Sequence, residues 1–489
     1  MIILMKDCVG LFIRIIFLPK MEKGGPLMPV NSFETYPMSW RPSRREIECR
    51  AQPFYKALAA QLMADIENGK ILPGTKLPPQ RELADFLDVN VSTVSKAFRY
   101  CSNGGFLTSV VGRGTFVAYD AGMNVSVAPD RTSLIEMGSM MPERLAGDAV
   151  AALVVEMMGD PSREVFFQYA YGTDGFYQEA ARRLLEDVGV VPEGPVLFAS
   201  GGQNALAAVL STFFHPGDRI GVDPLVYPGL KSAAKLFGIR LVPVGQQDGE
   251  ISEDGLLYAL KNHHIKGLYV MPDFQNPTTH TMSVAGRERL AALAKKHDLL
   301  IIEDAIAALF TEKPMPSIKT LAPEQTVYIF SLSKAILPAL RLAYVVPPRR
   351  LEEQLSSALY TLNLSQSALL MELAARLVVS GKCGALLALR RQSLRERNEL
   401  ANRILRGWPL AGGAEALCRW LTLPEGLTGQ VFEALCRDQG VRLLGAEHFA
   451  VGTDVPVNGA RLAIGAPYDR VSLEKGLHII KKVLDSYRT

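Results

Sequence analysis

A lysine and two carboxylates follow apolar runs, where buried side chains can do chemistry. Lys334 comes after the run Thr326–Phe330, in the order Phe-Ser-Leu-Ser-Lys. A lysine in this place is either a surface residue, the usual case, or an activated amine that attacks a carbonyl carbon. Glu303 and Asp304 end the run that begins at Leu299. Because a buried carboxylate is costly without a partner, we expect a cation or a ligand beside this pair.

Two polar loops have the composition to bind a ligand. Residues 200–204 read Ser-Gly-Gly-Gln-Asn and precede a helix predicted over Ala205–Phe214. The N–H groups and the positive dipole end at the start of a helix suit a phosphate, although glycine-rich turns before helices are common and mostly structural. The loop Met271–Thr278 contains Asn276-Pro277, which is also typical of a simple turn. Neither loop defines a function by itself.

The elements that must position these residues alternate between helices and strands. From Leu134 onward, amphipathic helical patterns separate short apolar runs. This alternation predicts an α/β layer with a mainly parallel sheet, in which ligands bind at the carboxyl ends of the strands. The strands are predicted over Arg219–Val222, Gly267–Met271, Leu299–Ile302, Thr326–Phe330 and Leu342–Val346.

Together, the four motifs resemble the pyridoxal 5′-phosphate (PLP) site of fold-type-I aminotransferases, from about Phe167 to Thr489. The resemblance implies that Lys334 forms the Schiff base with the cofactor. It also implies that Asp304 pairs with the ring nitrogen, which keeps the ring protonated as an electron sink. Asn276 would bind the ring 3′-oxygen, and Tyr227 would stack on the ring.

The same resemblance implies which residues bind the anionic groups. Arg341, seven residues after Lys334, would bind the cofactor phosphate. The other phosphate ligands implied are Ser331, Ser333 and the turn at Gly201, Gly202 and Gln203. Arg461, within Ala460–Gly465, would hold the carboxylate of an amino acid.

One position departs from this resemblance. Aminotransferases usually have a tyrosine two or three residues after the ring-nitrogen aspartate, whereas Ile306 and Ala307 stand there in this chain. Asn276 is then the only expected partner of the ring oxygen. The departure argues against transaminase turnover as the main role, but not against cofactor binding. We predict no metal site, because His263 and His264 are adjacent and their side chains point apart in regular structure.

The segment Pro53–Ala118 shows a different order of elements. Helical patterns over residues 54–69, 80–87 and 91–102 precede two β-rich runs, Phe106–Val111 and Thr115–Val117. This order predicts a winged helix. Its last helix has a buried stripe of Val94, Ala97, Phe98 and Cys101, opposite Ser92, Lys96 and Arg99. Small hydroxyls and a cation suit the DNA major groove, although a winged helix used for protein contacts would look similar.

The strings Leu72–Leu87, Asn90–Phe98 and Gly112–Val117 resemble the DNA-binding domain of GntR-family repressors. The resemblance implies that Arg81 contacts a phosphate or a base. It also implies DNA contacts from the start of the recognition helix and the tip of the wing, namely Asn90, Ser92, Thr93, Lys96, Gly112 and Arg113. Many relatives have an arginine at the position of Val91, so we predict no direct guanine contact there.

Composition sets the remaining limits. The 489 residues are 48% hydrophobic and 21% charged, which is ordinary for a globular protein of at least two folded units. A net charge of +3 excludes a histone-like protein. The six cysteines are far apart, as expected for reduced thiols in a cytoplasmic protein. No run approaches the ~20 apolar residues of a membrane span.

These patterns predict four segments. Residues 1–40 form a poorly ordered extension, 50–118 the GntR-type winged helix, 119–133 a linker, and 134–489 the aminotransferase-like domain with a small C-terminal α/β subdomain. The apolar stretch of residues 11–18 contains Arg14 and has no clear cleavage site after it, so we do not expect a signal peptide.

The two domains in this order resemble the MocR subfamily of bacterial transcription regulators. The predicted function is a DNA-binding regulator that carries PLP and senses the cofactor, or an amine or amino acid. The resemblance implies a head-to-tail homodimer, and such a dimer would bind an operator of two half-sites. Two alternatives remain: a functional PLP-dependent aminotransferase with an accessory N-terminal domain, and a regulator that no longer binds the cofactor.

Overall fold

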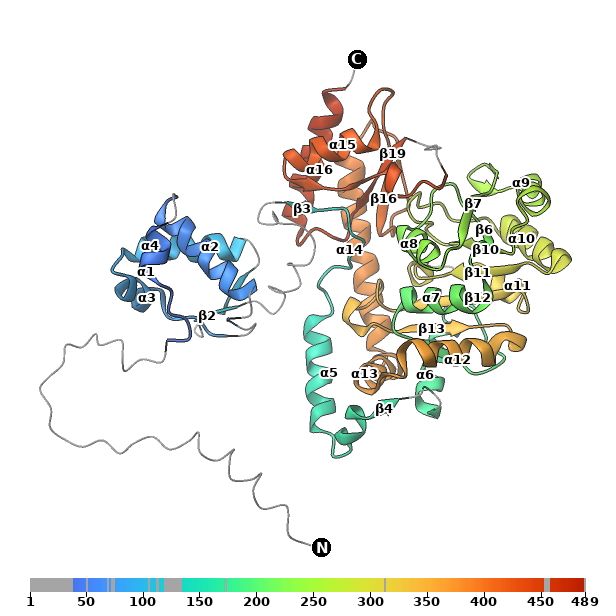
Figure 1. Cartoon of the computed structure of the whole chain (residues 1–489), viewed down its shortest axis with the longest axis horizontal. Helices are drawn as coiled ribbons and strands as arrows, with labels where there is room; N and C mark the ends of the chain where they lie inside the picture. The colour runs from blue at the N-terminus through green and yellow to red at the C-terminus, as the bar shows by residue number, and fades with distance from the viewer. Residues whose placement is uncertain are drawn as a thin grey trace, which may run out of the picture. The chain divides into compact units, whose positions relative to one another are not determined.

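The computed structural model describes residues 38–487, with gaps at 50–51, 68–69, 72–74, 104–105, 111–113, 118–133, 171, 173, 312–313 and 453–457. The chain divides into two compact units, Met1–Ser133 and Leu134–Thr489. Figure 1 labels their helices and strands. The linker expected over 119–133 lies outside the described residues, and so do residues 1–37 of the expected N-terminal extension.

The first unit is a winged helix, as predicted. It consists of α2 (Phe54–Glu67), α3 (Gln80–Leu87), α4 (Val91–Asn103) and an antiparallel hairpin of β1 (Leu107–Val110) and β2 (Gly114–Val117). Asp88 ends α3 in the left-handed conformation, with φ 50°. The buried stripe predicted for α4 is confirmed, because Val94, Ala97, Phe98 and Cys101 all lie in the core of this unit.

This unit begins earlier in the chain than predicted. Helix α1 (Arg44–Glu48) precedes α2 and buries Ile47. Trp40 is only 5% exposed, and its Nε1 donates a hydrogen bond to Oδ2 of Asp65 at 3.0 Å. The extension predicted up to residue 40 is therefore too long. An indole whose N–H meets a buried carboxylate contributes to the core like any other large side chain.

The second unit contains a seven-stranded sheet in the order β5-β13-β12-β11-β10-β6-β7. The five strands from β12 to β7 are parallel, while β13 is antiparallel to both β12 and β5. The prediction of a mainly parallel sheet is confirmed. The strands are β5 (Leu197–Ala199), β6 (Arg219–Val222), β7 (Arg240–Pro243), β10 (Gly267–Val270), β11 (Leu300–Asp304), β12 (Thr326–Ser331) and β13 (Ala343–Val346).

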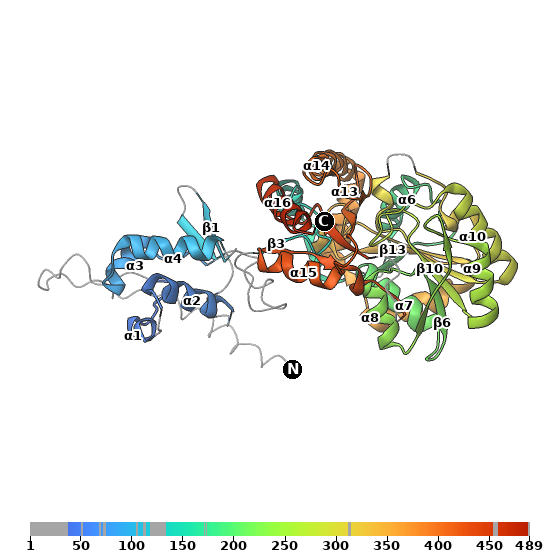
Figure 2. The ribbon, with the colours of Figure 1, turned by 90° about the horizontal axis from the view of Figure 1, so that it is seen from above.

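Helices cover both faces of this sheet, as Figure 2 shows for α7 and α8 on one side and α6 and α10 (Val284–His297) on the other. Helices α7 (Gly202–Phe213), α8 (Pro228–Leu236) and α12 (Glu352–Asn363) share a core with Tyr269 and Ile302. Helices α6 (Gly175–Glu186) and α13 (Ala368–Val379) share a core with Tyr328 on the opposite face. Because strand side chains alternate, Asp304 lies on the same face as Tyr269.

The predicted small C-terminal subdomain is also present. It has four antiparallel strands in the order β15-β16-β19-β18, which pack against α15 (Gly429–Asp438) and α16 (Arg470–Asp485). Strand β3 (Ile135–Glu136) pairs with β17 (Val441–Arg442), so the start of the second unit is attached to this subdomain. We call residues 137–141, which follow β3, the strap. The strands are β15 (Leu410–Ala411), β16 (Cys418–Thr422), β18 (Leu444–Gly445) and β19 (Gly459–Ala463).

Neither a membrane-spanning helix nor a metal-binding cluster occurs among the described residues. None of the helices there has the length and apolar character to cross a membrane. No group of three or more His, Cys, Asp or Glu side chains there could hold a metal ion. His264 instead ends a helical turn in the left-handed conformation, with φ 51°.

Candidate functional site

The residues predicted to bind the cofactor lie at one edge of the sheet. Asp304 ends β11, Ser331 ends β12, and Asn276 lies in the loop after β10. The carboxyl ends of neighbouring parallel strands lie side by side, so the topology brings these residues together. Ser331 and Asn276 are each 2% exposed, and Asp304 is 7% exposed. These three side chains are buried, whereas Arg341 and Gln203 of the predicted phosphate site are exposed.

Lys334 contacts the strap. Its Nζ donates a hydrogen bond to the main-chain oxygen of Met140 at 2.6 Å. Burial lowers the pKa of Lys334 to about 8, and the positive charges of Arg461 and Arg341 contribute in the same direction. Near pH 8 about half of this amine is uncharged, which is the form that attacks a carbonyl carbon.

Asp304 offers one carboxylate oxygen to a ligand. Its Oδ2 accepts a hydrogen bond from the hydroxyl of Tyr269 at 2.6 Å. Its Oδ1 is buried and has no hydrogen-bond partner among the described residues. Burial raises the pKa of Asp304 to about 6, although the hydrogen bonds from Tyr269 and from the N–H of Ile306 oppose this shift. Asp304 is therefore mostly ionised at neutral pH and can accept a further hydrogen bond.

Glu303, the other carboxylate of the predicted pair, is not part of this site. It lies on the opposite face of β11 and accepts hydrogen bonds from the N–H groups of Ile318 and Lys319, at 3.1 and 2.7 Å. These groups belong to the start of α11 (Ile318–Leu321). Glu303 therefore has a helix start as its hydrogen-bond partner, and the charge of Arg287 also favours its ionised form.

The start of α7 forms a cradle with Arg341. Gly201 has φ 88°, and a Cβ atom placed there would lie 2.6 Å from Nη2 of Arg341. The positive φ favours glycine at this position, and the short distance shows that the guanidinium lies directly against the helix start. The hydroxyl oxygens of Ser331 and Ser333 are 3.2 Å apart, and that of Ser331 also donates to the main chain of Leu342, next to Arg341. The hydroxyl of Ser333, the guanidinium and the helix N–H groups form a donor set for phosphate, and Ser331 can join it by turning its hydroxyl away from Leu342.

Tyr227 is joined to this cradle. Its hydroxyl donates to Oε1 of Gln203 at 3.1 Å, while Nε2 of Gln203 donates to the main chain of Gly229 at 2.9 Å. Burial, and next the charge of Asp304, raise the pKa of Tyr227. Gln203 therefore uses its side chain to hold Tyr227, and only its main chain is left for an anion.

Arg461, on β19, lies between Asn276 and the strap. Its Nη1 donates to Oδ1 of Asn276 at 2.7 Å, and its Nη2 donates to the main-chain oxygen of Gly138. The guanidinium also lies 4.8 Å from the ring centre of Phe449. Its Nε is buried and has no hydrogen-bond partner among the described residues. A carboxylate that binds the Nε–Nη2 side would satisfy this donor.

These residues fit PLP. The unpartnered Oδ1 of Asp304 suits the protonated ring nitrogen, and the Nδ2 group of Asn276 can donate because its Oδ1 is taken by Arg461. The Gly201 cradle suits the phosphate, and the amine of Lys334 suits the aldehyde. All the cofactor residues predicted from the sequence therefore lie in one place. Residues 306 and 307, where a tyrosine is missing, provide no hydroxyl.

Five of the predicted DNA-binding residues lie on α3, on α4 and at the start of α4 in the first unit. Arg81, Asn90, Ser92 and Lys96 are exposed, and Thr93 is half-buried. Oδ1 of Asn90 accepts a hydrogen bond from the N–H of Ser92 at 2.8 Å, so this side chain also caps α4. The predicted wing contacts Gly112 and Arg113 lie outside the described residues.

Sequence reasoning missed four features near these sites. Tyr269 binds Asp304, Phe449 packs on Arg461, and the strap supplies main-chain acceptors to both Lys334 and Arg461. On the winged helix, the exposed Lys76 pairs through its main chain with Phe116 of the wing. Only Lys76 had a signal in the sequence, as a cation shortly before the helix–turn–helix. The others depend on contacts between distant segments.

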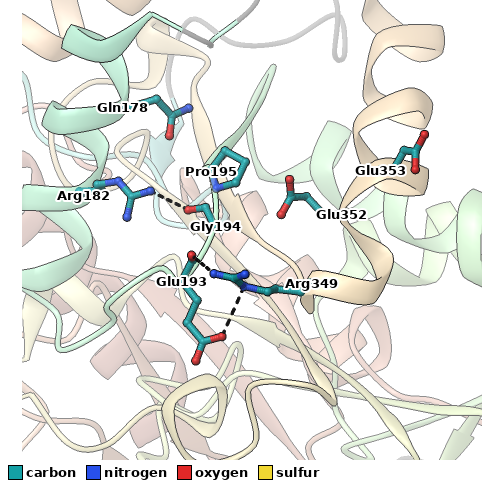
Figure 3. Close-up of a pocket in the computed structure, with 8 residues that line it drawn as sticks. All are labelled: Gln178, Arg182, Glu193, Gly194, Pro195, Arg349, Glu352 and Glu353. Carbon is teal, nitrogen blue, oxygen red and sulfur yellow. Dashed lines mark hydrogen bonds and ion pairs between the residues drawn. The ribbon is translucent and has the colours of Figure 1, made fainter.

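A surface pocket lies apart from this site (Figure 3). Arg182 and Arg349 donate there to the main-chain oxygens of Gly194 and Glu193, at 2.8 and 2.5 Å. Because both guanidinium groups already donate to main-chain oxygens of the protein, we assign no ligand to this pocket. Its lining residues are Gln178, Arg182, Glu193, Gly194, Pro195, Arg349, Glu352 and Glu353.

Family comparisons agree with both units. Residues 147–480 match the aminotransferase class I and II family, and residues 54–117 match the bacterial regulatory proteins of the gntR family. The chain is 46% identical over 462 residues to the uncharacterized HTH-type transcriptional regulator YdeF of Bacillus subtilis, a match that covers 94% of this chain and 99% of YdeF.

The chain also has two more distant similarities. The HTH-type pyridoxine biosynthesis transcriptional regulator PdxR of Corynebacterium glutamicum is 26% identical over 304 residues, which cover 60% of this chain and 65% of PdxR. The crystal structure of LysN, an alpha-aminoadipate aminotransferase from Thermus thermophilus, superposes with a TM-score of 0.65 at 26% identity, and covers 72% of this chain and 92% of LysN. The chain therefore belongs to the aminotransferase class I and II family and, with its GntR-type DNA-binding domain, is a transcriptional regulator of the MocR type.

Proposed function

We propose that this regulator binds PLP covalently through Lys334 and changes its DNA binding in response to the cofactor or to an amine or amino acid. The observation that carries the proposal is the buried, unpartnered Oδ1 of Asp304 at the same sheet edge as an amine of lowered pKa. When bound, PLP supplies an aldehyde that condenses with amines and a ring that withdraws electrons from them.

Each residue of the site has a defined task in this proposal. Lys334 attaches the cofactor, and ionised Asp304 accepts a hydrogen bond from the ring nitrogen. Asn276 donates to the ring oxygen through Nδ2, because its Oδ1 accepts from Arg461. Tyr227 packs on the ring. The phosphate is held by Arg341, Ser331, Ser333 and the main chain of Gly201, Gly202 and Gln203.

The effector class follows from Arg461. A carboxylate on its Nε–Nη2 side would make two charge-assisted hydrogen bonds, so amino acids should bind more tightly than amines without a carboxylate. The solved LysN structure contains N-(5'-phosphopyridoxyl)-L-leucine, a joined form of the cofactor and an amino acid. PdxR is named as a regulator of pyridoxine biosynthesis, which supports the cofactor itself as the other candidate signal.

We further propose a cytoplasmic, head-to-tail homodimer that binds an operator of two half-sites. Apolar side chains around the β4–β14 pair support a dimer: Phe167 is 59% exposed, Tyr169 66% and Leu364 46%. Strand β4 (Tyr169–Ala170) pairs with β14 (Gln366–Ser367), so the segments that carry these side chains meet at this pair. Exposed apolar patches of this kind mark protein interfaces. Mass measurement in solution should give twice 53.5 kDa.

The attachment site is tested by reduction with borohydride in the presence of PLP, followed by peptide mapping. We expect one adduct, on Lys334, and no adduct in the Lys334→Ala variant. Lys319 is an internal control, because burial also lowers its pKa to about 8 but its Nζ donates to three main-chain oxygens, of Pro323, Thr326 and Pro347. An adduct on Lys319, or no adduct in the wild type, would refute the assignment.

A further inference from the structure

Tyr269 lies in the middle of β10 and is 1% exposed. In the parallel pairing of β10 with β11, Tyr269 is opposite Ile302, so Asp304 lies two residues further along the same face. The tyrosine side chain spans this offset, and its hydroxyl donates to Oδ2 of Asp304 at 2.6 Å. The short bond links two strands at the carboxyl edge of the sheet.

This bond, together with the N–H of Ile306, holds the carboxylate of Asp304 in place. A carboxylate can turn about its Cβ–Cγ bond, and the tyrosine holds Oδ2 while Oδ1 remains buried and without a partner among the described residues. The hydroxyl also stabilises the charged form of a carboxylate that burial pushes toward protonation. The tyrosine hydroxyl therefore offsets part of the free-energy cost of burying a charged carboxylate at this position.

We infer that Tyr269 is a positioning residue for the cofactor: it fixes Asp304 with Oδ1 toward the ring nitrogen and keeps that carboxylate ionised. The inference rests on the proposed function, since it concerns the same site. Tyr269 is not a replacement for the tyrosine that is missing at positions 306 and 307, because the two side chains have different roles. The missing hydroxyl would have bound the ring oxygen, whereas Tyr269 acts only through Asp304.

Other charged groups surround this pair and must be kept constant in a test. Tyr227 faces Asp304 from the start of α8, and Asp223 follows β6 on the other side of Tyr269. Lys334 and Arg341 bring positive charge from the segment that follows β12, and Arg461 brings it from β19. Burial and the charge of Asp304 raise the pKa of Tyr269 well above its usual value, so the hydroxyl keeps its proton throughout the range of an experiment.

The test is Tyr269→Phe in the full chain, with two readouts on the PLP-loaded protein. Loss of one hydrogen bond to a carboxylate should weaken PLP binding about tenfold in a spectrophotometric titration. It should also raise, by about 0.5 to 1 pH unit, the midpoint at which the visible absorption changes with pH. Without the tyrosine hydroxyl, Asp304 is less ionised, so the cofactor ring would carry less positive charge. A positive ring disfavours protonation of the Lys334 nitrogen joined to it, so the loss of that positive charge raises the midpoint.

Tyr328→Phe is the matched control. Tyr328 is a buried tyrosine, also 1% exposed, on β12 of the same sheet, but its register partner is Glu303 and it points to the opposite face. The Tyr328→Phe variant also loses one buried hydroxyl, and it should fold. Both its PLP affinity and its absorption midpoint should equal those of the wild type. If Tyr269→Phe behaves like Tyr328→Phe, the inference is wrong.

A double-mutant cycle separates positioning from a general packing effect. In an Asp304→Asn background, Tyr269→Phe should change neither readout further, because the tyrosine acts through the carboxylate. A full effect in that background would overturn the inference. If wild-type protein takes up no PLP at all, the proposed function fails instead, so the two failures are distinguishable.

A second substitution guards against misfolding of the phenylalanine variant. Site-specific 3-fluorotyrosine at position 269 keeps the size of the side chain and makes the hydroxyl a stronger donor. It should lower the absorption midpoint, in the opposite direction to Tyr269→Phe. An unchanged midpoint with fluorotyrosine would contradict the inference even if the phenylalanine variant cannot be purified.

Discussion

The amine of Lys334 and the main-chain oxygen of Met140 are 2.6 Å apart, although 194 residues separate them in the chain. Arg461 donates to Gly138 in the same strap. The amine proposed to attach the cofactor and the guanidinium proposed to bind an effector therefore both contact the strap, whose residues follow β3 at the start of the second unit. Glu136 on β3 holds the strap through the N–H groups of Gly138 and Ser139, at 2.8 and 2.7 Å. A ligand on these cations must exchange with strap contacts.

The first prediction concerns this exchange. With PLP-loaded protein, leucine should speed hydrogen–deuterium exchange in residues 137–141 by about fivefold, because its carboxylate takes the Arg461 donor that Gly138 now accepts from. 3-Methylbutylamine, which has the same side chain without the carboxylate, should have a smaller effect. Equal exchange with both ligands would show that Arg461 does not recognise the carboxylate. A ligand shifts the equilibrium between two conformations only if it binds them with different affinity. Because leucine makes the additional carboxylate contact, it should also change DNA affinity more than 3-methylbutylamine does.

The second prediction is a pH dependence of cofactor loading. The pKa of Lys334 is lowered from the usual 10.5 to about 8, so the amine is mostly uncharged above pH 8. An ordinary lysine reaches this state only above pH 10.5. The rate of PLP attachment should rise about tenfold per pH unit from pH 6 toward 8 and then level off. Arg461→Met should move this midpoint upward, because it removes a nearby positive charge. Stopped-flow absorbance measures both rates, and a midpoint near 10 would contradict the placement of Lys334.

The third prediction separates the regulator from an enzyme. Residues 306 and 307 lack the phenol that usually contacts the ring oxygen, so conversion of common amino acids by the PLP-loaded protein should be far slower than ordinary enzyme turnover. Multiple turnovers with a keto-acid acceptor at ~1 s⁻¹ or faster would favour the aminotransferase alternative. The Lys334→Ala variant gives the background rate.

The sequence supported the strands and helices that carry strong periodicity. The predicted β6 matches its observed bounds, and α3 does so as well. It missed β5 and β7, which are the two edge strands of the sheet and have only 3 and 4 residues. Short edge strands have no long apolar run, so periodicity does not detect them.

The candidate site divides in the same way. Lys334, Asp304 and Arg341 stand in local motifs, and a resemblance to a known family could assign them roles. Tyr269 and the strap could not be found this way, because their importance comes from strand register and from a contact across 194 residues. Side chains that act through another residue have no motif of their own.

The fourth prediction tests the double role of Asn90. Asn90→Ala removes the cap on α4 and should cost about 1 kcal/mol in the free energy of unfolding of the winged helix. Asn90→Ser keeps a capping oxygen without the amide group, so it should have nearly wild-type thermal stability. If the amide also contacts a base, the serine variant should still bind operator DNA about fivefold or more weakly. If the serine variant and the wild type bind DNA with equal affinity, Asn90 caps α4 but does not contact a base.

The fifth prediction concerns the division of labour on the DNA-binding face. Arg81 and Lys96 are exposed cations on α3 and α4, so Arg81→Ala or Lys96→Ala should weaken binding to all DNA sequences. Each should lower the slope of log affinity against log salt by about 0.9, the value for one phosphate contact. Lys56→Ala removes an equally exposed cation from α2, outside the recognition helix, and should leave the slope unchanged.

Ser92→Ala and Thr93→Ala should behave differently from the cation variants. Both residues lie in the first turn of α4, where hydroxyls come within reach of base edges. Loss of a base contact should cost about 1–3 kcal/mol on a duplex selected by the wild-type protein from random DNA, and almost nothing on unrelated DNA. A duplex with one half-site should bind the dimer much more weakly than one with two. If Arg81→Ala and Lys96→Ala bind the selected duplex as tightly as wild type at matched salt, these residues are not phosphate contacts and another face of the winged helix must meet the DNA.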